Sequence, residues 1–406
     1  SLLKKEGDHF EGFVPEVFWV THAGNRKVGE KLAIRPTSEA ISYDSYSKWI
    51  RSWRDLPLLL NFWNNVMRAE IKSTKPFIRN SEFLWQEGHT AHSTEEEAKK
   101  EVNDILKMYK KLIEEELAIP VLTGMKSENE KFVGAKYTTT LEAIMPDGLA
   151  LQMGTSHNLG QNFSKPFEIR FIGSDKQEHF VWQTSWGVSW RLIGALIMIH
   201  GDDKGLVLPP KIASIKVIII PIYYNDNDAI PVKEKSEKLA NKLRENNIEV
   251  FEDKREYYTP GWKFHNWEMK GIPIRMEIGP RDISKEEVTL VRRDTSEKIS
   301  VKENEVIEKV SSLLEEIQNN LFEKAKKLQE QFNTKVENFE DFKNSIRGKG
   351  GFIQACWCLE SKCENEIKDE TGADIRIIPF KDEKVFGPCV HCGKEGKKVV
   401  YFARSY

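Results

Sequence analysis

Three arginines stand where their side chains could hold a polyphosphate. Arg68 lies in a strand-like run, Arg79 in the loop that follows it, and Arg191 at the start of an apolar helix. An arginine on an apolar helix is costly to bury unless it is paired or binds an anion. Planar guanidinium groups match phosphate oxygens. The three together therefore predict a clamp for a triphosphate. Each arginine considered alone is better explained as a surface or structural residue.

Thr37 and Glu39 are two residues apart in the segment AIRPTSEA and could bind an amine. They share one face if the segment is extended. A buried glutamate there would receive an ammonium group, and the hydroxyl would orient it. The alternative is that this tripeptide begins a helix, where serine and threonine often act as the N-cap.

The segment SEFLWQEGHT alternates in the way that a strand does. Phe83, Trp85 and Glu87 fall on one face, whereas Glu82, Leu84 and Gln86 fall on the other. We expect a second strand, in residues 150–163, to face the first set. Each of His89 and His157 could equally be a core histidine with satisfied hydrogen bonds.

All five cysteines lie between Cys356 and Cys392, which indicates one local site and not a secreted disulfide scaffold. Cys358 and Cys363 form one close pair, and Cys389 and Cys392 form another. Two thiolate pairs on separate loops are typical of a tetrahedral Zn²⁺ site. Cys356 and His391 are alternative ligands, and the competing interpretation is a set of reduced cysteines without metal.

The composition narrows the class of protein. A chain of 406 residues with 39% hydrophobic residues can form two to four domains. The net charge of −2 means that any RNA contact must come from a local basic face. No run of 18 apolar residues predicts a membrane span, and no signal-like stretch opens the chain. We therefore expect a cytoplasmic protein.

Periodicity predicts an α+β fold. Strand-like runs occur at 58–72, 81–90 and 150–163, and helical patterns at 94–117 and 190–199, the second apolar nearly all round and so expected to be buried. An antiparallel sheet with helices packed on it is the expected first domain, over 1–211. A βαβαβ rhythm predicts a small α/β domain over 212–301, followed by a helical linker over 302–347 and a cysteine-containing α/β domain over 348–406.

Several motifs together resemble the prolyl-tRNA synthetases of class II. They are RPTSEA, RAE, RNSEFLWQEGHT, MGTSHNLGQNF and TSWGVSWR followed by HGDDKGLVLPP. The resemblance covers nearly the whole chain. It implies the antiparallel catalytic sheet of that class, a homodimer, and the joining of proline to tRNA(Pro) at the expense of ATP. It also implies that motif 1, which contributes to the dimer contact in that family, lies before Ser1.

The resemblance assigns roles to the residues named above. Arg68 and Arg191 become the catalytic residues. The implied ATP-binding residues, with Mg²⁺ between the phosphates, are Arg68, Glu70, Arg79, Phe83, Gln152, Thr155, Ser189 and Arg191. The implied proline-binding residues are Thr37, Glu39, Arg68, Trp85, Glu87, His89 and His157, with Ser156 also expected on the facing strand. The zinc of the tail, held by Cys358, Cys363, Cys389 and Cys392, is expected to be structural.

The chain departs from the family pattern at one place. Ser189 and Trp190 precede Arg191, where the family commonly has two small hydroxyl residues. Only about 60 residues separate Glu87 from the strand at 150, which leaves no room for an inserted editing domain and favours the archaeal/eukaryotic-like branch.

The resemblance also favours tRNA binding by the segment 259–282, which mixes aromatic and charged residues. Arg275 and Glu277 are the suggested readers of the guanines in a proline anticodon. Three rival interpretations are the threonine enzyme, a catalytically silent tRNA-binding paralogue and a zinc-dependent RNA-binding module. The absence of cysteine from residues 1–355 argues against the first, the three arginines argue against the second, and RPTSEA argues against the third.

Overall fold

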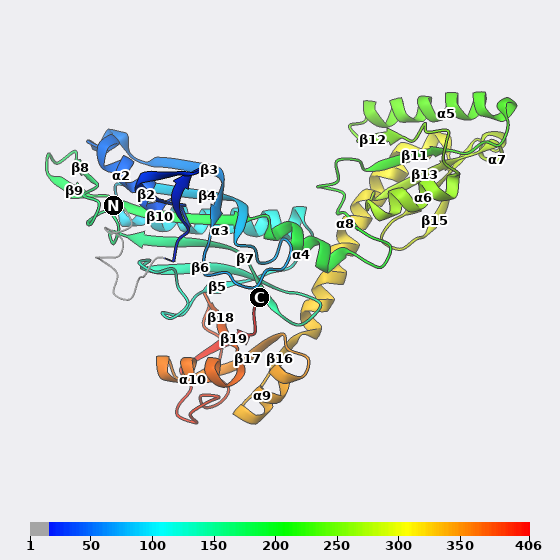
Figure 1. Ribbon diagram of the computed structural model, residues 1–406. Helices are drawn as coiled ribbons and strands as arrows, with labels where there is room; N and C mark the ends of the chain where they lie inside the picture. Colours follow the sequence, from blue (N-terminus) through cyan, green and yellow to red (C-terminus); the bar gives the residue numbers. More distant parts are fainter. Residues whose placement is uncertain (1–15) are drawn as a thin grey trace. The chain divides into compact units, whose positions relative to one another are not determined.

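The computed structural model describes residues 16–406, which fall into two compact units (Figure 1). The first contains the described residues up to Lys111, then Val121–Ala195 and Gln329–Tyr406; the second contains Leu112–Pro120 and Leu196–Leu328. What the sequence predicts for residues 1–15, including the start of the first domain, lies outside the described residues.

A ten-stranded sheet organises the first unit, with the strands in the order β16-β17-β19-β18-β5-β6-β7-β10-β4-β3. Every neighbouring pair is antiparallel except β16 and β17. The predicted antiparallel sheet is confirmed. The strands are β3 (Leu58–Met67), β4 (Glu82–His92), β5 (Leu122–Met125), β6 (Tyr137–Ile144), β7 (Ala150–Gly160), β10 (Trp182–Ser189), β16 (Asn333–Lys335), β17 (Phe352–Trp357), β18 (Asp374–Pro379) and β19 (Lys398–Ala403).

Two hairpins and several helices complete this unit. The hairpins pair β1 (Trp19–Ala23) with β2 (Arg26–Ala33) and β8 (Arg170–Ile172) with β9 (Glu178–Phe180). The helices are α2 (Glu39–Trp49), the 3₁₀ turn η1 (Trp53–Asp55), α3 (Glu95–Lys111), α9 (Phe339–Arg347) and α10 (Ser361–Thr371). Helix α4 (Arg191–His200) begins in the first unit and ends in the second.

Helix α3 forms where the 3.6-residue periodicity predicts it. The Thr94 hydroxyl accepts a hydrogen bond from the Glu97 backbone N–H, and the Glu97 carboxylate accepts one from the Thr94 N–H. This reciprocal capping box satisfies donors that the first helical turn leaves free. Ala98, Val102 and Tyr109 are buried on the face that contacts β7 and β10. The predicted helix over 94–117 differs in its last turn: α3 ends at Lys111, and residues Leu112–Glu116 form the π-helix η2.

The prediction that α4 is buried all round is wrong. Ile193 is 50% exposed and Ile197 is 37% exposed, whereas Ala195 and Leu196 are buried. Residues four apart lie on the same helical face, so the face that carries these two isoleucines is partly exposed. The continuous apolar sequence therefore does not reveal that one side of this helix is partly exposed to solvent.

The second unit is built on the sheet β12-β11-β13-β14-β15. Strand β11 is parallel to β12 and β13, and the remaining pairs are antiparallel, which confirms the predicted α/β rhythm. Strand β11 lies inside this sheet, and its residues 217–220 are fully buried. The elements are β11 (Val217–Pro221), α5 (Asp226–Glu245), β12 (Val250–Glu252), α6 (Pro260–Met269), β13 (Ile274–Ile278), α7 (Pro280–Ser284), β14 (Glu287–Arg292), β15 (Lys298–Lys302), η3 (Glu303–Glu305) and α8 (Val306–Gln331).

The predicted apolar stripe of α8 packs into the core of this unit. Val306, Val310, Leu313, Ile317 and Leu321 are buried there, and Leu314 is partly buried. Among residues 16–406, no helix combines the length and the apolar character needed to cross a bilayer.

The C-terminal strands continue the first unit's sheet through β18, which pairs with β5 (Figure 1). Ile378 lies opposite Met125, and Pro379 lies opposite Gly124. A Cβ atom on Gly124 would stand 2.4 Å from the carbonyl oxygen of Ile378 and 2.6 Å from the Ile377 Cγ2. Only glycine allows this close approach of two backbones.

Gly124→Ala should therefore separate β5 from β18 and lower the thermal midpoint of the protein, because overpacking a close backbone contact costs about 1–3 kcal/mol. The matched control is Gly29→Ala, since a Cβ on Gly29 meets nothing within 4 Å. Differential scanning fluorimetry compares the two variants. Equal midpoints would show that the join between the strands tolerates a methyl group.

Candidate active site

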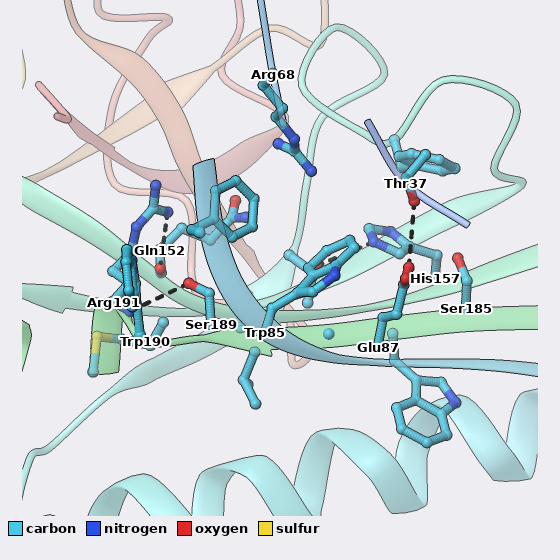
Figure 2. A pocket seen from close by; sticks show the side chains of 18 of the residues that line it. Thr37, Arg68, Trp85, Glu87, Gln152, His157, Ser185, Ser189, Trp190 and Arg191 are labelled. Atoms are coloured by element: carbon cyan, nitrogen blue, oxygen red, sulfur yellow. Dashed lines mark hydrogen bonds between the residues drawn. The ribbon is translucent and has the colours of Figure 1, made fainter. Parts of the chain in front are cut away.

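A cavity of about 240 Å³ opens above strands β4, β7 and β10 of the first unit (Figure 2). Alternation along β4 points Phe83, Trp85, Glu87 and His89 into it, as the sequence predicts. The predicted site residues that line this cavity are Thr37, Glu39, Arg68, Phe83, Trp85, Glu87, His89, Gln152, Thr155, His157, Ser189 and Arg191.

Three predicted residues do not line the cavity. Glu70 and Arg79 are exposed on the connection between β3 and β4, outside its walls. Ser156 is fully buried and points to the opposite face of β7, because successive strand residues alternate.

Sequence reasoning missed other lining residues. Ser185 and Gly187 line the cavity from β10, on the same face as the predicted Ser189, so period-two alternation was the signal that could have found them. Glu130 and Phe132 come from the connection between β5 and β6, where no periodicity marks them.

Buried acidic groups and one histidine form the first end of the cavity. Glu39, Glu87 and His89 are 4%, 1% and 1% exposed. The Thr37 hydroxyl donates to the Glu39 carboxylate, and the His89 Nε2 lies 2.9 Å from the Glu87 carboxylate. Thr37 and Glu39 thus adopt the orienting contact that the sequence suggests, even though Glu39 is the first residue of α2.

The charges of this group favour an ammonium ligand. Burial lowers the pKa of His89, but the charges of Glu39 and Glu87 outweigh it, so the pKa is raised overall. Burial raises the pKa of Glu87, yet the hydrogen bonds from His89, Ser38 and Asn64 outweigh burial and lower it overall. Two carboxylates against one imidazole leave this group with a net negative charge, which suits a cationic amine.

An apolar wall stands beside the acidic group. Trp85 supplies one ring, and Phe132 packs on His157 with 4.8 Å between the ring centroids. The two ring nitrogens of His157 contact the hydroxyls of Thr138 and Thr155 at 2.9 and 3.1 Å. Burial, with smaller contributions from His89 and Arg68, lowers the pKa of His157 to about 3. His157 is therefore a neutral part of the wall at physiological pH.

The Arg191 guanidinium defines the other end of the cavity. The Arg191 Nε donates to the Ile78 carbonyl at 2.9 Å, and its Nη1 donates to the Gln152 carbonyl at 3.3 Å. Burial, then the charge of Arg68, lowers the pKa of Arg191 to about 10, so it stays protonated at neutral pH. These contacts hold the charge in place but do not neutralise it.

The Arg68 guanidinium lies between the two ends, as Figure 2 shows. It lies 5.3 Å from the Phe83 ring centroid and 5.8 Å from that of Trp85. No carboxylate of the described residues forms an ion pair with it. An arginine held by aromatic rings and free of acidic partners is suited to bind an anion.

Trp190 also lines the cavity, from the position where the family pattern is broken. Its ring makes an edge contact with Phe77, with 5.5 Å between centroids. The Ser189 hydroxyl accepts a hydrogen bond from the Arg191 backbone N–H at 3.3 Å. Trp190 thus packs against the loop between β3 and β4, while Ser189 helps to begin α4.

A second site lies in the C-terminal strands and helices. The sulfur atoms of Cys358, Cys363, Cys389 and Cys392 all lie within 4.8 Å of one another. The Cys358 Sγ is 3.6 Å from that of Cys363 and 3.8 Å from that of Cys392. Four thiolates about 2.3 Å from a tetrahedral Zn²⁺ would be about 3.8 Å apart, so the thiol set fits this ion.

The alternative ligands lie beside this set. The Cys356 Sγ accepts a hydrogen bond from the Phe386 backbone N–H at 3.5 Å. The His391 ring lies 3.5 Å from the Glu366 carboxylate. The possible ligand atoms of His391, Glu366 and Cys363 all lie within 4.8 Å of one another. The four cysteines predicted from their spacing are thus brought together, and Cys356 stands outside.

Metal analysis of the freshly purified protein should find about one zinc ion per chain, because the four clustered thiols supply all four ligands of one tetrahedral zinc site. Cys363→Ser should lower the zinc content, while Cys356→Ser should leave it unchanged. Mass spectrometry under native conditions measures both. Protein isolated without metal, with its thiols free, would refute the site.

Comparisons with known proteins agree with this geometry. Residues 18–200 match the tRNA synthetase class II core domain (G, H, P, S and T), residues 216–313 match the anticodon binding domain, and residues 339–406 match the prolyl-tRNA synthetase C-terminal family. Over its whole length the chain is 53% identical to the proline–tRNA ligase of Cenarchaeum symbiosum (strain A), of which it covers 85%. The chain belongs to the prolyl-tRNA synthetase family.

Other members of the prolyl-tRNA synthetase family are comparably similar. The proline–tRNA ligase of Natranaerobius thermophilus is 53% identical over an alignment of 408 positions, which covers 100% of this chain and 84% of that protein. The prolyl-tRNA synthetase of Cryptosporidium parvum, solved as a complex with halofuginone and AMPPNP, matches with a TM-score of 0.93 and 46% identity. That match covers 100% of this chain and 85% of the solved one.

Proposed function

We propose that this protein activates proline with ATP and transfers the prolyl group to tRNA(Pro), releasing pyrophosphate and AMP. One observation carries the proposal: a single cavity joins a buried acidic group suited to an amine with two guanidiniums suited to phosphate. The family's relatives, named as proline–tRNA ligases, support the choice of proline.

In the first step the proline carboxylate attacks the α-phosphorus of ATP, and pyrophosphate leaves. Arg68 holds the carboxylate and the α-phosphate together, because its guanidinium lies between the two ends of the cavity. Charge spreads over the phosphate oxygens in the transition state, so positioning and electrostatic stabilisation are the main catalytic terms.

The remaining ATP contacts follow from the walls of the cavity. Arg191 holds the outer phosphates of MgATP, whose metal ion is bound chiefly through those phosphates. Phe83 stacks on the adenine, and Gln152, Thr155 and Ser189 contact the nucleotide. Glu70 and Arg79 would complete this end if the loop between β3 and β4 folds inward when ATP binds.

The proline contacts use the opposite end. Glu39, oriented by Thr37, receives the secondary ammonium group, while Glu87 and His89 set the local charge. Trp85 and His157 flank the pyrrolidine ring. In the second step the terminal ribose hydroxyl of the tRNA attacks the prolyl-adenylate, and the adenylate's own phosphate oxygens accept the proton.

The anticodon of the tRNA would bind the second unit. Arg275 and Glu277, the suggested readers, are paired at 2.9 Å, and Lys298 lies 3.3 Å from Glu277. The rings of Tyr258 and Trp262 are stacked at 3.8 Å, and both are more than 40% exposed. Unpaired bases stack on such rings, so these two aromatics are better placed than the ion pair.

Association as a homodimer is part of the proposal. Strand β3 ends the ten-stranded sheet, and Leu59 and Trp63 on it are 55% and 82% exposed. Leu84 on β4 is also exposed. Apolar side chains gathered near an open strand suit a contact with a second copy of the chain. We place the protein in the cytoplasm, where tRNA is charged.

We also propose that the chain divides as its sequence suggests: a catalytic domain over 1–211, an anticodon-binding domain over 212–301, a helical linker over 302–347 and a zinc-binding domain over 348–406. The zinc ion there is structural, since four thiols leave it no position for a substrate.

Proline-dependent exchange of labelled pyrophosphate into ATP tests the function. The natural full-length protein should catalyse this exchange with proline, and should then charge tRNA(Pro). Exchange with another amino acid only, or none from a folded protein, would overturn the assignment.

A further inference from the structure

The connection between β5 and β6 forms part of the amino-acid end of the cavity. This segment, residues 126–136, carries Glu130 and Phe132 into the cavity wall. The Phe132 ring lies 4.8 Å from that of His157, and the Phe132 backbone N–H donates to the Thr138 hydroxyl at 3.0 Å. The position of the Phe132 ring therefore sets the shape of the wall beside His157.

The second half of this segment is held by neighbouring parts of the first unit, since the Gly134 carbonyl accepts from the Asn162 side chain at 2.9 Å and Phe132 packs on the core around Phe163. Within the segment the hydrogen bonds are local. The backbone N–H groups of Glu130 and Lys131 donate to the Ser127 carbonyl, and the Ala135 N–H donates to the Phe132 carbonyl. Such turns fix a local shape but do not fix where the first half of the segment, residues 127–131, lies. That position must come from contacts with residues distant in the sequence.

Helix α10 supplies those contacts from 237 residues further along the chain. The Ser127 hydroxyl donates to one oxygen of the Glu364 carboxylate, and the Asn129 side-chain amide donates to the other at 3.0 Å. Lys368 forms an ion pair with Glu130 at 2.8 Å. The first half of the segment is thus attached to a helix that does not itself line the cavity.

These contacts differ in strength because they differ in burial. Glu364 is 3% exposed and Ser127 is 1% exposed, so a donor or acceptor left unpaired there has no water to replace its partner. The Lys368 amine is half exposed, and an exposed ion pair contributes little. The two hydrogen bonds to Glu364 are therefore the main attachment.

A buried ion pair at the start of this segment attaches it to β18 as well. Lys126 lies 2.6 Å from the Glu142 carboxylate, which also contacts the Arg376 guanidinium at 2.9 Å. Arg376 belongs to β18, the strand that joins β5. Lys126 is thus linked to β18 through Glu142, and Ser127 and Asn129 are attached to α10.

We propose that Glu364 is a positioning residue for amino-acid binding: through Ser127 and Asn129 it holds residues 126–132 so that Phe132 and Glu130 close the proline end of the cavity. This inference rests on the proposed function. Glu364 does not touch the substrate; it acts through the segment. Cys363, the residue before Glu364 on α10, is one of the four clustered cysteines, so this turn of the helix carries both a predicted zinc ligand and the positioning residue.

Steady-state pyrophosphate exchange on Glu364→Ala tests the proposal. The KM for proline should rise about tenfold, because a segment that is no longer held must be ordered when proline binds; tenfold corresponds to about 1.4 kcal/mol. The KM for ATP and the kcat should change less than about twofold, since the described contacts of Arg68 and Arg191 are with Phe83, Trp85, Ile78 and Gln152. Asp369→Ala, an exposed acid on the same helix, is the matched control.

Milder variants separate positioning from folding. Ser127→Ala and Asn129→Ala remove one donor each and should each raise the KM for proline, whereas Glu364→Gln should be less affected than Glu364→Ala because it keeps one acceptor. In the double variant Ser127→Ala/Glu364→Ala the effects should not add, since both remove the same hydrogen bond. Zinc content and the thermal midpoint are measured for every variant.

The outcomes are distinct. An unaltered protein without proline-dependent exchange would overturn the proposed function, whatever the variants do. An active protein in which Ser127→Ala and Glu364→Ala leave the KM for proline at the value of Asp369→Ala would overturn this inference alone. If Glu364→Ala loses zinc or unfolds, the result with Ser127→Ala decides: an unchanged KM for proline refutes the positioning role.

Discussion

Arg68→Ala should abolish proline-dependent pyrophosphate exchange, with a loss of at least about 100–1,000-fold in kcat, while tRNA binding stays nearly intact. The Arg68 guanidinium reaches between the two ends of the cavity and has two aromatic rings beside it but no described carboxylate paired with it. Removing a preorganised charge that stabilises a developing anion costs a factor of this size.

A filter-binding assay with tRNA(Pro) and the exchange assay together check this expectation. Arg54→Ala is the matched control, because Arg54 also lies over an aromatic ring, that of Trp53, but outside the cavity. Equal loss of exchange and of tRNA affinity would mean that the ATP site has been placed wrongly.

Glu39→Gln should raise the KM for proline by about 30-fold or more, because truncating one partner of a buried charge pair costs about 2–5 kcal/mol. The substitution keeps the volume and the contact with Thr37 but removes one negative charge. Only Glu87 and His89 are then left at this end of the cavity, so its negative charge falls by one and the ammonium group loses its counter-ion.

Steady-state exchange at varied proline and varied ATP measures the effect, and Glu96→Gln on the exposed side of α3 serves as the control. The KM for ATP should stay close to that of the unaltered protein, since Glu39 is at the other end of the cavity. A rise in the KM for ATP alone would place the ammonium site elsewhere.

Much of the site could be predicted because its signals are local. Alternation along 81–90 placed Phe83, Trp85 and Glu87 on one face, and the cavity lies on that face. The spacing of the cysteines predicted a cluster, and their sulfur atoms are grouped. In both cases the signal lay within one strand or within two short stretches of sequence.

What could not be predicted depends on contacts between distant residues. Nothing near Ser127 in the sequence indicates that Glu364 accepts its hydrogen bond, nor that β18 extends the sheet beside β5. Periodicity also failed for α4, because an apolar residue carries no sign of whether another element covers it. Glu70 and Arg79 lie on a connection whose course no pattern specifies.

The join between β5 and β18 means that the proposed zinc-binding domain, residues 348–406, shares the sheet of the first unit and cannot be removed from it as an independent module. Deleting residues from 348 onward would leave β5 with unpaired backbone donors and acceptors, the situation that promotes aggregation through strand addition. The same deletion would remove Arg376 and leave Lys126 as the one cation beside the fully buried Glu142 among the described contacts. Truncated protein is therefore expected to precipitate, so its inactivity would say nothing about whether the tail takes part in catalysis.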